Sequence, residues 1–286
     1  MERHAYLIMA HGNHTQLSKL VSALDDERND IYIHIDKKTR NINEKMITAI
    51  NSKVKFIEQI NVNWGGYSIV KCELLLLEAA VKSDTDYVRY HLISGVDLPI
   101  KSQDYIHDFF EDNHGEYIRF DPKPISLYED RVKYYYPFQN IIGRNNGRFV
   151  ALLYYVQNIF VKIQRLIQVD RSKTINIYKG VNWFSITDEL ARFVLANKKF
   201  VQKHFRYTLC ADEMFLHTVV QNSPYKENVV NNSLRFIDWE RGKPYTFTIE
   251  DYNMLIHSPD LFARKFDENR DSDIIDLILH EVSDNN

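Results

Sequence analysis

Short apolar runs alternate with amphipathic stretches through the first 120 residues of the chain. The runs are β-branched or alternate apolar with polar positions, which predicts buried strands. The stretches between them space their apolar residues three or four apart, which predicts helices. The expected strands are 5–10, 31–36, 54–58, 86–94 and 115–120, and the clearest helices are 68–82 and 102–110.

Strands that alternate with helices imply an α/β domain with a mostly parallel sheet and helices on both of its faces. Ligands of such sheets bind beyond the carboxyl ends of the strands. The loops that begin at His11, Asp36, Asn61 and Ser94 are therefore the candidate binding loops. No internal repeat and no linker divides residues 1–286, so we expect a single domain.

The chain changes character over residues 121–180, which are rich in tyrosine and basic residues. Within them, residues 149–169 predict a helix whose polar positions fall largely on one side. One interpretation packs this helix on the domain or on a second subunit. In the second case the protein would be a homodimer. The other lays it on a membrane surface, with Lys162 and Arg165 near the lipid headgroups. A strand at 181–186 follows.

Lys and Arg number 36 against 39 Asp and Glu, so the net charge is −3. This near balance argues against a protein that coats nucleic acid. The charge is uneven, because residues 117–210 hold 16 basic residues against 6 acidic ones. Such a region suits contact with phosphate or anionic lipid.

Cys72 and Cys210 form no CxxC pair and no metal-like cluster, which suits a reducing compartment. The apolar run 5–9 is too short for a signal peptide. No stretch reaches the roughly 18 apolar residues that a membrane span needs. These features predict a cytoplasmic protein.

Two loops have the residues of a ligand site. Gly65 belongs to a glycine pair before a strong helix, where the backbone can turn tightly and approach a ligand. After the strand 86–94, Ser94 and Gly95 permit a sharp turn. Asp97 then either projects into the crevice or accepts N–H groups of its own loop.

Asp212 and Glu213 lie together at a predicted helix start. They either complement the positive end of the helix dipole or place one carboxylate at a substrate. Adjacent side chains diverge, so the two cannot flank a glycosidic bond as the acid pair of a glycosidase must. A single carboxylate suits a different task, the deprotonation of a hydroxyl nucleophile.

Two basic clusters near the C-terminus lie beside aromatic residues. Arg241 and Lys243 follow Trp239, and Arg264 and Lys265 lie between two phenylalanines. These cations form either an anion site or an ordinary solvated surface.

Eight segments in collinear order resemble the core-2/I-branching β-1,6-N-acetylglucosaminyltransferase and peptide O-xylosyltransferase family, glycosyltransferase family 14. The region 121–179 is covered least. The segments are AYLIMAHGN (5–13), IYIHIDKK (31–38), NWGGYSIVKCELLLL (63–77), SGVDLPIKS (94–102), GVNWFSIT (180–187), ADEMFLHTVV (211–220), RFIDW (235–239) and PYTFTIEDYNMLIHSPDLFARKFD (244–267).

The resemblance implies a GT-A-like, Rossmann-like fold and an inverting sugar transfer from a nucleotide sugar without a divalent metal. Many GT-A enzymes hold a metal through an Asp-x-Asp loop, but the corresponding loop here, SGVD, has one acid. In the family, basic side chains near the C-terminus neutralise the diphosphate instead. Lys265 matches that lysine, and Arg241 and Lys243 are the candidates for its partner.

The resemblance also implies a role for each candidate residue. Glu213 matches the catalytic base, and Trp183 resembles an aromatic residue that lines the acceptor side. The nucleotide and donor set comprises His11, Gly12, Asp36, Trp64, Gly65, Ser94, Gly95, Asp97, Arg241, Lys243, Arg264 and Lys265, and the acceptor set comprises Arg131, Lys133, Tyr134, Trp183 and Asp212.

The implied division of labour follows the chain. Residues 1–120 would bind the nucleotide sugar, 121–180 would form an inserted basic region near acceptor and membrane, and 181–286 would carry the base and the diphosphate site. Animal members have an anchor, a stem and disulfides that this sequence lacks, so it resembles a bacterial member at the cytoplasmic face of the inner membrane.

The resemblance therefore predicts a UDP-sugar donor, with UDP-GlcNAc first and UDP-xylose and UDP-galactose as alternatives. The predicted acceptor is a glycan, free or lipid-linked, in surface polysaccharide or capsule synthesis. Neither a metal nor nucleic acid is an expected ligand. An inactive carbohydrate-binding or scaffold protein on the same fold remains the alternative from another class.

Overall fold

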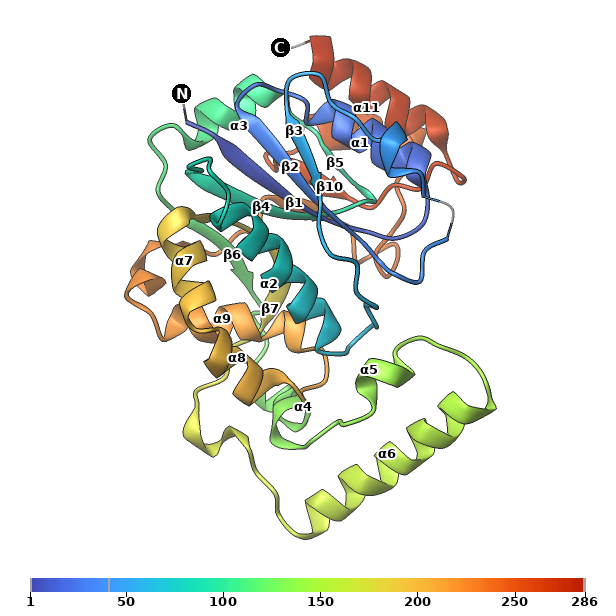
Figure 1. Cartoon of the computed structure of the whole chain (residues 1–286), viewed down its shortest axis with the longest axis vertical. Helices are drawn as coiled ribbons and strands as arrows, with labels where there is room; N and C mark the ends of the chain where they lie inside the picture. The colour runs from blue at the N-terminus through green and yellow to red at the C-terminus, as the bar shows by residue number, and fades with distance from the viewer. Residues whose placement is uncertain (1, 41, 285–286) are drawn as a thin grey trace.

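The computed structural model describes residues 2–40 and 42–284. Its centre is a sheet of seven strands in the order β3-β2-β1-β4-β7-β6-β8 (Figure 1). The strands are β1 (His4–Ala10), β2 (Asn29–Ile35), β3 (Lys53–Phe56), β4 (Arg89–Ser94), β6 (Glu116–Phe120), β7 (Gly180–Thr187) and β8 (Val229–Val230).

All the sheet strands except β7 run in one direction, which confirms a mostly parallel sheet. β1 pairs in parallel with β2 and β4, whereas β7 is antiparallel to both β4 and β6. In the β4–β7 register, Ser185 lies opposite His91 and Thr187 opposite Arg89. The first residues of β7 therefore lie at the carboxyl end of β4.

Helices cover both faces of this sheet, as expected. β1 is buried on both sides: Tyr6 and Ile8 face one apolar cluster, and Ala5 and Leu7 face the other. The first cluster is covered by α1 (His14–Ala23), α3 (Gln103–Phe110), α10 (Tyr252–Ile256) and α11 (Ser272–Asp284), and the second by α2 (Ser68–Val81), α7 (Asp188–Ala196), α8 (Lys198–Phe205) and α9 (Phe215–Gln221).

A second sheet of three strands packs against the first. It has the order β5-β10-β9, with β5 at Asp97–Pro99, β10 at Phe262–Arg264 and β9 at Arg235–Ile237. Arg235 joins the two sheets, because its buried guanidinium donates to the carbonyls of Leu92 at 3.0 Å and Phe184 at 2.7 Å. It also donates to the Ser185 hydroxyl at 2.7 Å and stacks on Phe262.

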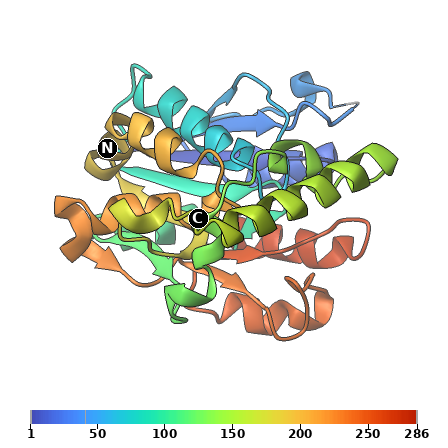
Figure 2. The same cartoon turned by 90° about the horizontal axis from the view of Figure 1, so that it is seen from below.

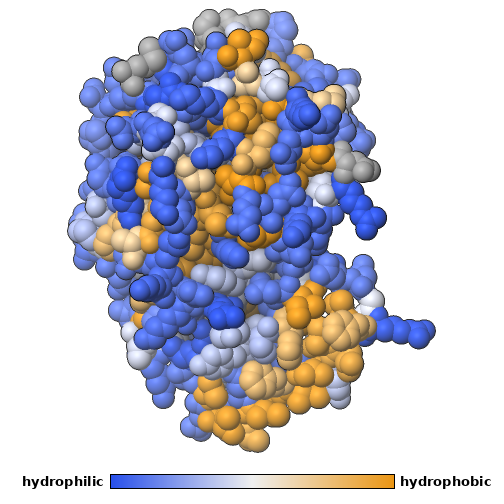
Figure 3. All heavy atoms as spheres, viewed as in Figure 1, coloured by the Kyte–Doolittle hydropathy of each residue, from blue (hydrophilic) through white to orange (hydrophobic). Residues whose placement is uncertain are grey.

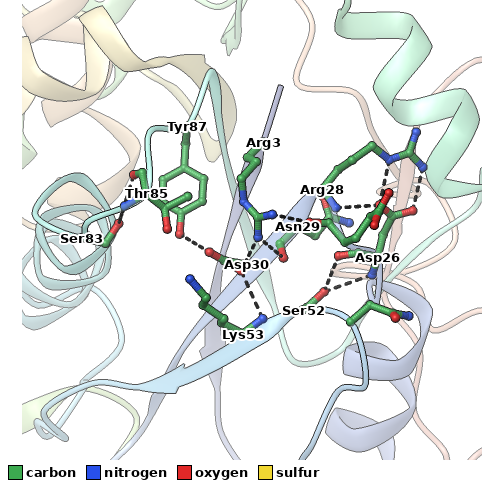
Figure 4. A network of polar contacts seen from close by, with 12 residues as sticks. Arg3, Asp26, Arg28, Asn29, Asp30, Ser52, Lys53, Ser83, Thr85 and Tyr87 are labelled. Carbon is green, nitrogen blue, oxygen red and sulfur yellow. Dashed lines mark hydrogen bonds and ion pairs between the residues drawn. The ribbon is translucent and has the colours of Figure 1, made fainter. Parts of the chain in front are cut away.

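The amino end of the sheet is closed by a polar network (Figure 4). The carboxylate of Asp30 accepts from Arg3 at 2.7 Å, from the Tyr87 hydroxyl at 2.6 Å and from the Lys53 amide at 3.1 Å. With this end tied together, the loops that carry the candidate residues emerge at the opposite, carboxyl end.

The basic region 121–180 connects the neighbouring strands β6 and β7. It forms α4 (Glu129–Lys133), α5 (Gln139–Ile142) and the longer α6 (Arg148–Leu166), which confirms the helix predicted at 149–169. α6 lies across one end of the molecule, farthest from α1 and α11 (Figures 1 and 2). In the part of the chain that is described, no helix is long and apolar enough to cross a membrane.

One local expectation differs from the structure, and one helix start is unusual. The strand predicted at 86–94 begins only at Arg89. Ser68 would be a natural residue to cap α2, yet it is the first helical residue, and its hydroxyl accepts the Asn63 amide at 2.8 Å instead. Because the chain turns tightly over residues 63–67, the Ser68 hydroxyl bonds to this turn and not to the first turn of α2.

Replacing Arg235 with methionine should destabilise the protein, because several buried carbonyls lose their donor. We expect the free energy of unfolding in a urea titration to fall by about 3 kcal/mol. The matched control is Arg192→Met, which removes only an exposed ion pair with Asp188 and should cost less than about 0.5 kcal/mol. Equal losses in the two variants would contradict the bridging role of Arg235.

Candidate active site

The loop after β4 is organised around the buried carboxylate of Asp97. It accepts the Ser94 amide at 2.8 Å, the Ser94 hydroxyl at 2.7 Å and the Arg264 guanidinium at 2.7 Å. Gly95 packs closely here, since a Cβ at that position would lie 3.2 Å from the Ala10 Cβ and would displace its neighbour slightly. Of the two alternatives for Asp97, the structure shows the second, since the carboxylate is fully buried and accepts an N–H group of its own loop. It also pairs with Arg264.

Arg264 links this loop to β7. Asp97 and Arg264 are register partners in the β5–β10 ladder. The guanidinium carbon of Arg264 lies 4.6 Å from the ring centre of Trp183, which is largely buried. Trp183 was predicted to line the acceptor side, and Arg264 was predicted to bind the donor. The contact between them therefore lies where the predicted donor and acceptor sides meet.

The loops after β1 and β2 lie beside these groups. Partial desolvation lowers the pKa of His11, the positive charges of Arg264 and Lys265 lower it further, and Asp36 opposes them. Charges that act on His11 in this way lie near it, so four of the predicted donor residues are neighbours: His11, Asp36, Arg264 and Lys265. Gly12 has a φ of 88°, a conformation that favours glycine, and nothing lies within 4 Å of where its Cβ would be.

The Asp36 carboxylate is held by its own loop. It accepts the Lys38 amide at 3.0 Å and the Val62 amide at 3.4 Å, and its other oxygen lies 3.4 Å from the Lys38 ammonium. Lys38 in turn donates to the Val62 carbonyl and the Asn63 side chain. Lys38 was not among the sequence candidates, although it lies two residues after one of them.

The predicted diphosphate cations fall into two groups. Arg241 is committed to Asp238 and Asp251, and it stacks on Tyr245. Lys243 is exposed to solvent. Among residues 2–40 and 42–284, no carboxylate forms an ion pair with Lys265, which leaves this partly buried ammonium available to an anion.

Glu213 lies at the same end of the sheet, in the short 3-10 turn Ala211–Glu213. Its Oε2 lies 2.8 Å from Arg131 and 3.3 Å from the ammonium of Lys179, the residue just before β7. Both cations stack on the ring of Tyr128. Because both ion pairs fall on Oε2, they orient the carboxylate without engaging Oε1.

The turn that carries Glu213 is fixed from behind by the glycine loop. Cys210 adopts a left-handed backbone with φ of 51°, and its amide donates to the Gly65 carbonyl at 2.9 Å. A Cβ on Gly65 would lie 3.4 Å from the Cys210 sulfur. The backbone of Gly65 was predicted to approach a ligand closely, and in the structure it approaches the turn that carries Glu213. Trp64 beside it is half exposed and stacks with Arg144.

Asp212 points away from Glu213 into the protein. Burial, and after it the charge of Glu213, raise the pKa of Asp212 to about 7. Behind it lies Glu73 of α2, only 2% exposed, whose pKa is raised well above its usual range by burial and then by Asp212, with the Asn182 side chain opposing. In the described chain, Asp212 Oδ1 and both oxygens of Glu73 are buried without a hydrogen bond of normal geometry.

The remaining acceptor candidates flank Arg131 on or next to α4. Tyr134 is buried beneath the guanidinium of Arg165, and the Lys133 carbonyl accepts the Arg171 amide. Of this group, only Arg131 contacts Glu213 directly.

Sequence reasoning missed Lys179 and Glu73. Lys179 directly precedes a segment that resembles the family, and Glu73 is an acid on the apolar helix 68–81. An acid among leucines on a buried helix was a readable signal. The nearness of Lys179 to Glu213 could not be read from the sequence, because 34 positions separate them in the chain.

No three His, Cys, Asp or Glu side chains within residues 2–40 and 42–284 come together in a way that could hold a metal ion. The side chains at the site are instead mainly cations and single acids.

The stability of the protein should fall as the pH rises through the range in which Asp212 ionises. Its folded pKa of about 7 exceeds the usual 3.8, so its contribution to stability is complete below about pH 4 and is lost toward about pH 8. Asp212→Asn should therefore melt at a temperature higher than wild type by roughly 5 °C near pH 8, with the gap closing toward pH 4.

Asp84→Asn, at an exposed aspartate, is the control and should show no such trend. A gap between Asp212→Asn and wild type that does not change with pH would contradict the buried, protonated state.

The comparisons with known proteins agree with this geometry. A family model described as Core-2/I-Branching enzyme matches residues 4–257. The chain is 23% identical over 307 residues to xylosyltransferase 2 of Rattus norvegicus, covering 96% of this chain and 33% of that protein. It is 24% identical over 306 residues to xylosyltransferase 1 of Homo sapiens, covering 96% and 30%.

The chain thus spans about a third of the length of these relatives. Among solved structures it is similar to mouse xyloside xylosyltransferase 1 in its apo form, with a TM-score of 0.40 and 9% identity over 92% of this chain and 97% of that one. The family match covers the seven-stranded sheet and most of the candidate residues, and it ends before β10, Arg264 and Lys265. It confirms the resemblance read from the sequence segments. The chain belongs to the Core-2/I-branching enzyme family.

Proposed function

We propose that the protein is an inverting, metal-independent glycosyltransferase that moves a sugar from a UDP-sugar to a hydroxyl of a glycan, with Glu213 as general base. One observation carries this proposal. The carboxylate of Glu213, with one oxygen paired to Arg131 and Lys179, lies at the carboxyl end of the sheet. The Asp97–Arg264 pair lies at the same end, as does Lys265, which pairs with no carboxylate of the described residues. A lone oriented base and a cationic site for a leaving group are what such a transfer needs.

In the proposed step, Oε1 of Glu213 accepts the proton of the acceptor hydroxyl. The hydroxyl oxygen forms a bond to the anomeric carbon from the face opposite the diphosphate. The bond from that carbon to the β-phosphate oxygen breaks, and UDP leaves with the electron pair. Lys265, with Arg264 beside it, stabilises the negative charge that grows on the departing phosphate.

The donor would lie across the carboxyl ends of β1, β2 and β4. We propose that His11, Gly12, Asp36 and the exposed Trp64 contact the nucleotide and that the loop Ser94–Asp97 contacts the sugar. The mutual proximity of His11 and Asp36 supports this proposal. GlcNAc is the donor sugar that the branching-enzyme resemblance favours. Xylose is the second candidate, because the relatives at 23–24% identity are named xylosyltransferases.

The acceptor would approach from α4 and β7, where Arg131 and Lys179 hold the base, and we propose that Trp183 and Asp212 line this side of the site. We propose a glycan acceptor, free or lipid-linked, in bacterial surface polysaccharide or capsule synthesis at the cytoplasmic face of the membrane. A panel of UDP-sugars separates this proposal from an inactive carbohydrate-binding or scaffold protein. An enzyme hydrolyses or transfers at least one of them, whereas a scaffold at most binds.

Glu213→Gln should abolish transfer while leaving UDP affinity close to wild type, because the amide cannot take the proton. We expect the rate to fall by about 10²–10⁴-fold, measured as UDP release with the best donor of the panel. Glu129→Gln, an exposed acid on α4, is the control and should retain full activity. If Glu213→Gln also lost UDP binding, the general-base assignment would be wrong.

The cations, rather than a metal, should neutralise the diphosphate. Lys265→Ala should weaken UDP binding by about tenfold in calorimetry, since a charge-assisted contact is lost. Lys199→Ala, at an exposed lysine of α8, should leave it unchanged. Transfer by the wild type should survive EDTA, and a strict requirement for Mn²⁺ would overturn this part of the proposal.

A further inference from the structure

The outward face of α6 is apolar, although the helix lies at the surface. Its exposed large side chains include Leu166 at 83% and Phe149 at 65%. Figure 3 shows the hydrophobic surface that they form at this end of the molecule. We call this surface the α6 face, and its residues are Phe149, Leu152, Tyr155, Val156, Ile159, Phe160, Ile163, Leu166 and Ile167.

α6 is docked on the protein by polar groups, which is the reverse of an ordinary surface helix. Its buried residues include two glutamines, Gln157 and Gln164, each 3% exposed. Gln164 accepts the Tyr135 amide at 2.8 Å and donates to its carbonyl at 3.0 Å, and Gln157 accepts the Phe138 amide at 3.0 Å. These bonds fix the roll of the helix, so that the apolar residues are held outward.

The charged residues of α6 itself are all basic. Residues 148–166 contain no acid, and Arg148 and Lys162 are exposed among the apolar side chains. Exposed Arg144 precedes the helix and exposed Lys173 follows it. Anionic lipid headgroups complement this set of cations, and the tyrosine and phenylalanine rings suit the boundary between headgroups and acyl chains.

We propose that the α6 face docks the protein on an anionic phospholipid bilayer, with α6 lying in the plane of the interface. A helix of 19 residues that mixes arginine, lysine and glutamine with apolar side chains cannot span the bilayer, but its apolar arc can enter the outer layer of the acyl chains. A two-fold contact with a second copy is a poorer fit, because it would bring the cations of one α6 against those of the other.

The same geometry ties the bilayer to the catalytic candidate. Asp130 of α4 pairs with Arg165 of α6, and the next residue, Arg131, pairs with Glu213. One short helix therefore contacts both the membrane-facing helix and the proposed base. Docking through α6 would hold the acceptor side of the site near the headgroups, where a lipid-linked acceptor presents its sugar.

Vesicle flotation of the full chain tests the docking, with phosphatidylcholine vesicles and with vesicles that also contain phosphatidylglycerol. No nucleotide sugar is added, so the outcome is independent of the proposed reaction. Wild type should float with the anionic vesicles and release as salt screens the cations. The variant Ile159→Ser/Ile163→Ser/Leu166→Ser should bind at least about tenfold more weakly, and Lys162→Glu should also bind more weakly.

The matched control replaces three exposed apolar residues elsewhere, Ile50→Ser/Ile249→Ser/Leu277→Ser, and should float like wild type. All variants should keep the wild-type melting temperature, because the changed side chains face solvent. The proposal is overturned if wild type stays with the unbound fraction or if the α6 variant floats equally well. It is also overturned if the α6 changes only convert a dimer to a monomer in light scattering, since a second copy would then cover the face.

Discussion

The geometry of the site depends on the ion pair between Asp97 and Arg264. A carboxylate that is fully removed from water must be paired and hydrogen-bonded, and Asp97 meets this requirement with Ser94 and Arg264. The pair fixes the loop after β4 against the second sheet, and it holds the guanidinium over Trp183. Because Lys265 follows Arg264 directly, the same pair also sets where the unpaired ammonium lies.

The cations around the site differ in what they are free to do. Arg264 and Arg241 already have carboxylate partners, and Arg131 and Lys179 share the carboxylate of Glu213. Among the described residues, no carboxylate pairs with Lys243 or Lys265, and of these two lysines only Lys265 is partly buried. A charge that has no internal partner gains most from an incoming phosphate. For this reason we expect adjacent Arg264 and Lys265 to differ: Arg264 holds Asp97, and Lys265 binds the phosphate.

A buried acid layer lies behind the base. Burial favours the protonated forms of both Glu73 and Asp212, and the charge of Asp212 raises the pKa of Glu73 further. A protonated Asp212 adds no second negative charge beside Glu213. Of the two acids side by side in this turn, Glu213 is the one that Arg131 and Lys179 hold.

The strand and helix order, the mostly parallel sheet and the family were all readable along the chain. Hydrophobic periodicity reports which residues are buried, and collinear motifs survive at low identity. Glu213, Asp97 and Lys265 were found in this way. Lys179, Lys38 and Glu73 were not found as site residues, since their importance comes from neighbours that the fold supplies.

The sequence by itself determined the layers of this protein, the loops that carry its chemistry and the existence of an amphipathic helix near residues 149–169. Only the tertiary structure decided which cations are paired, which way Asp212 points and which side of α6 faces out. The physical reason is that periodicity records burial, whereas pairing and orientation depend on distances between segments far apart in the chain. For α6, Gln157 and Gln164 bond to the segment 135–139 and face inward, while many apolar side chains of the helix face outward.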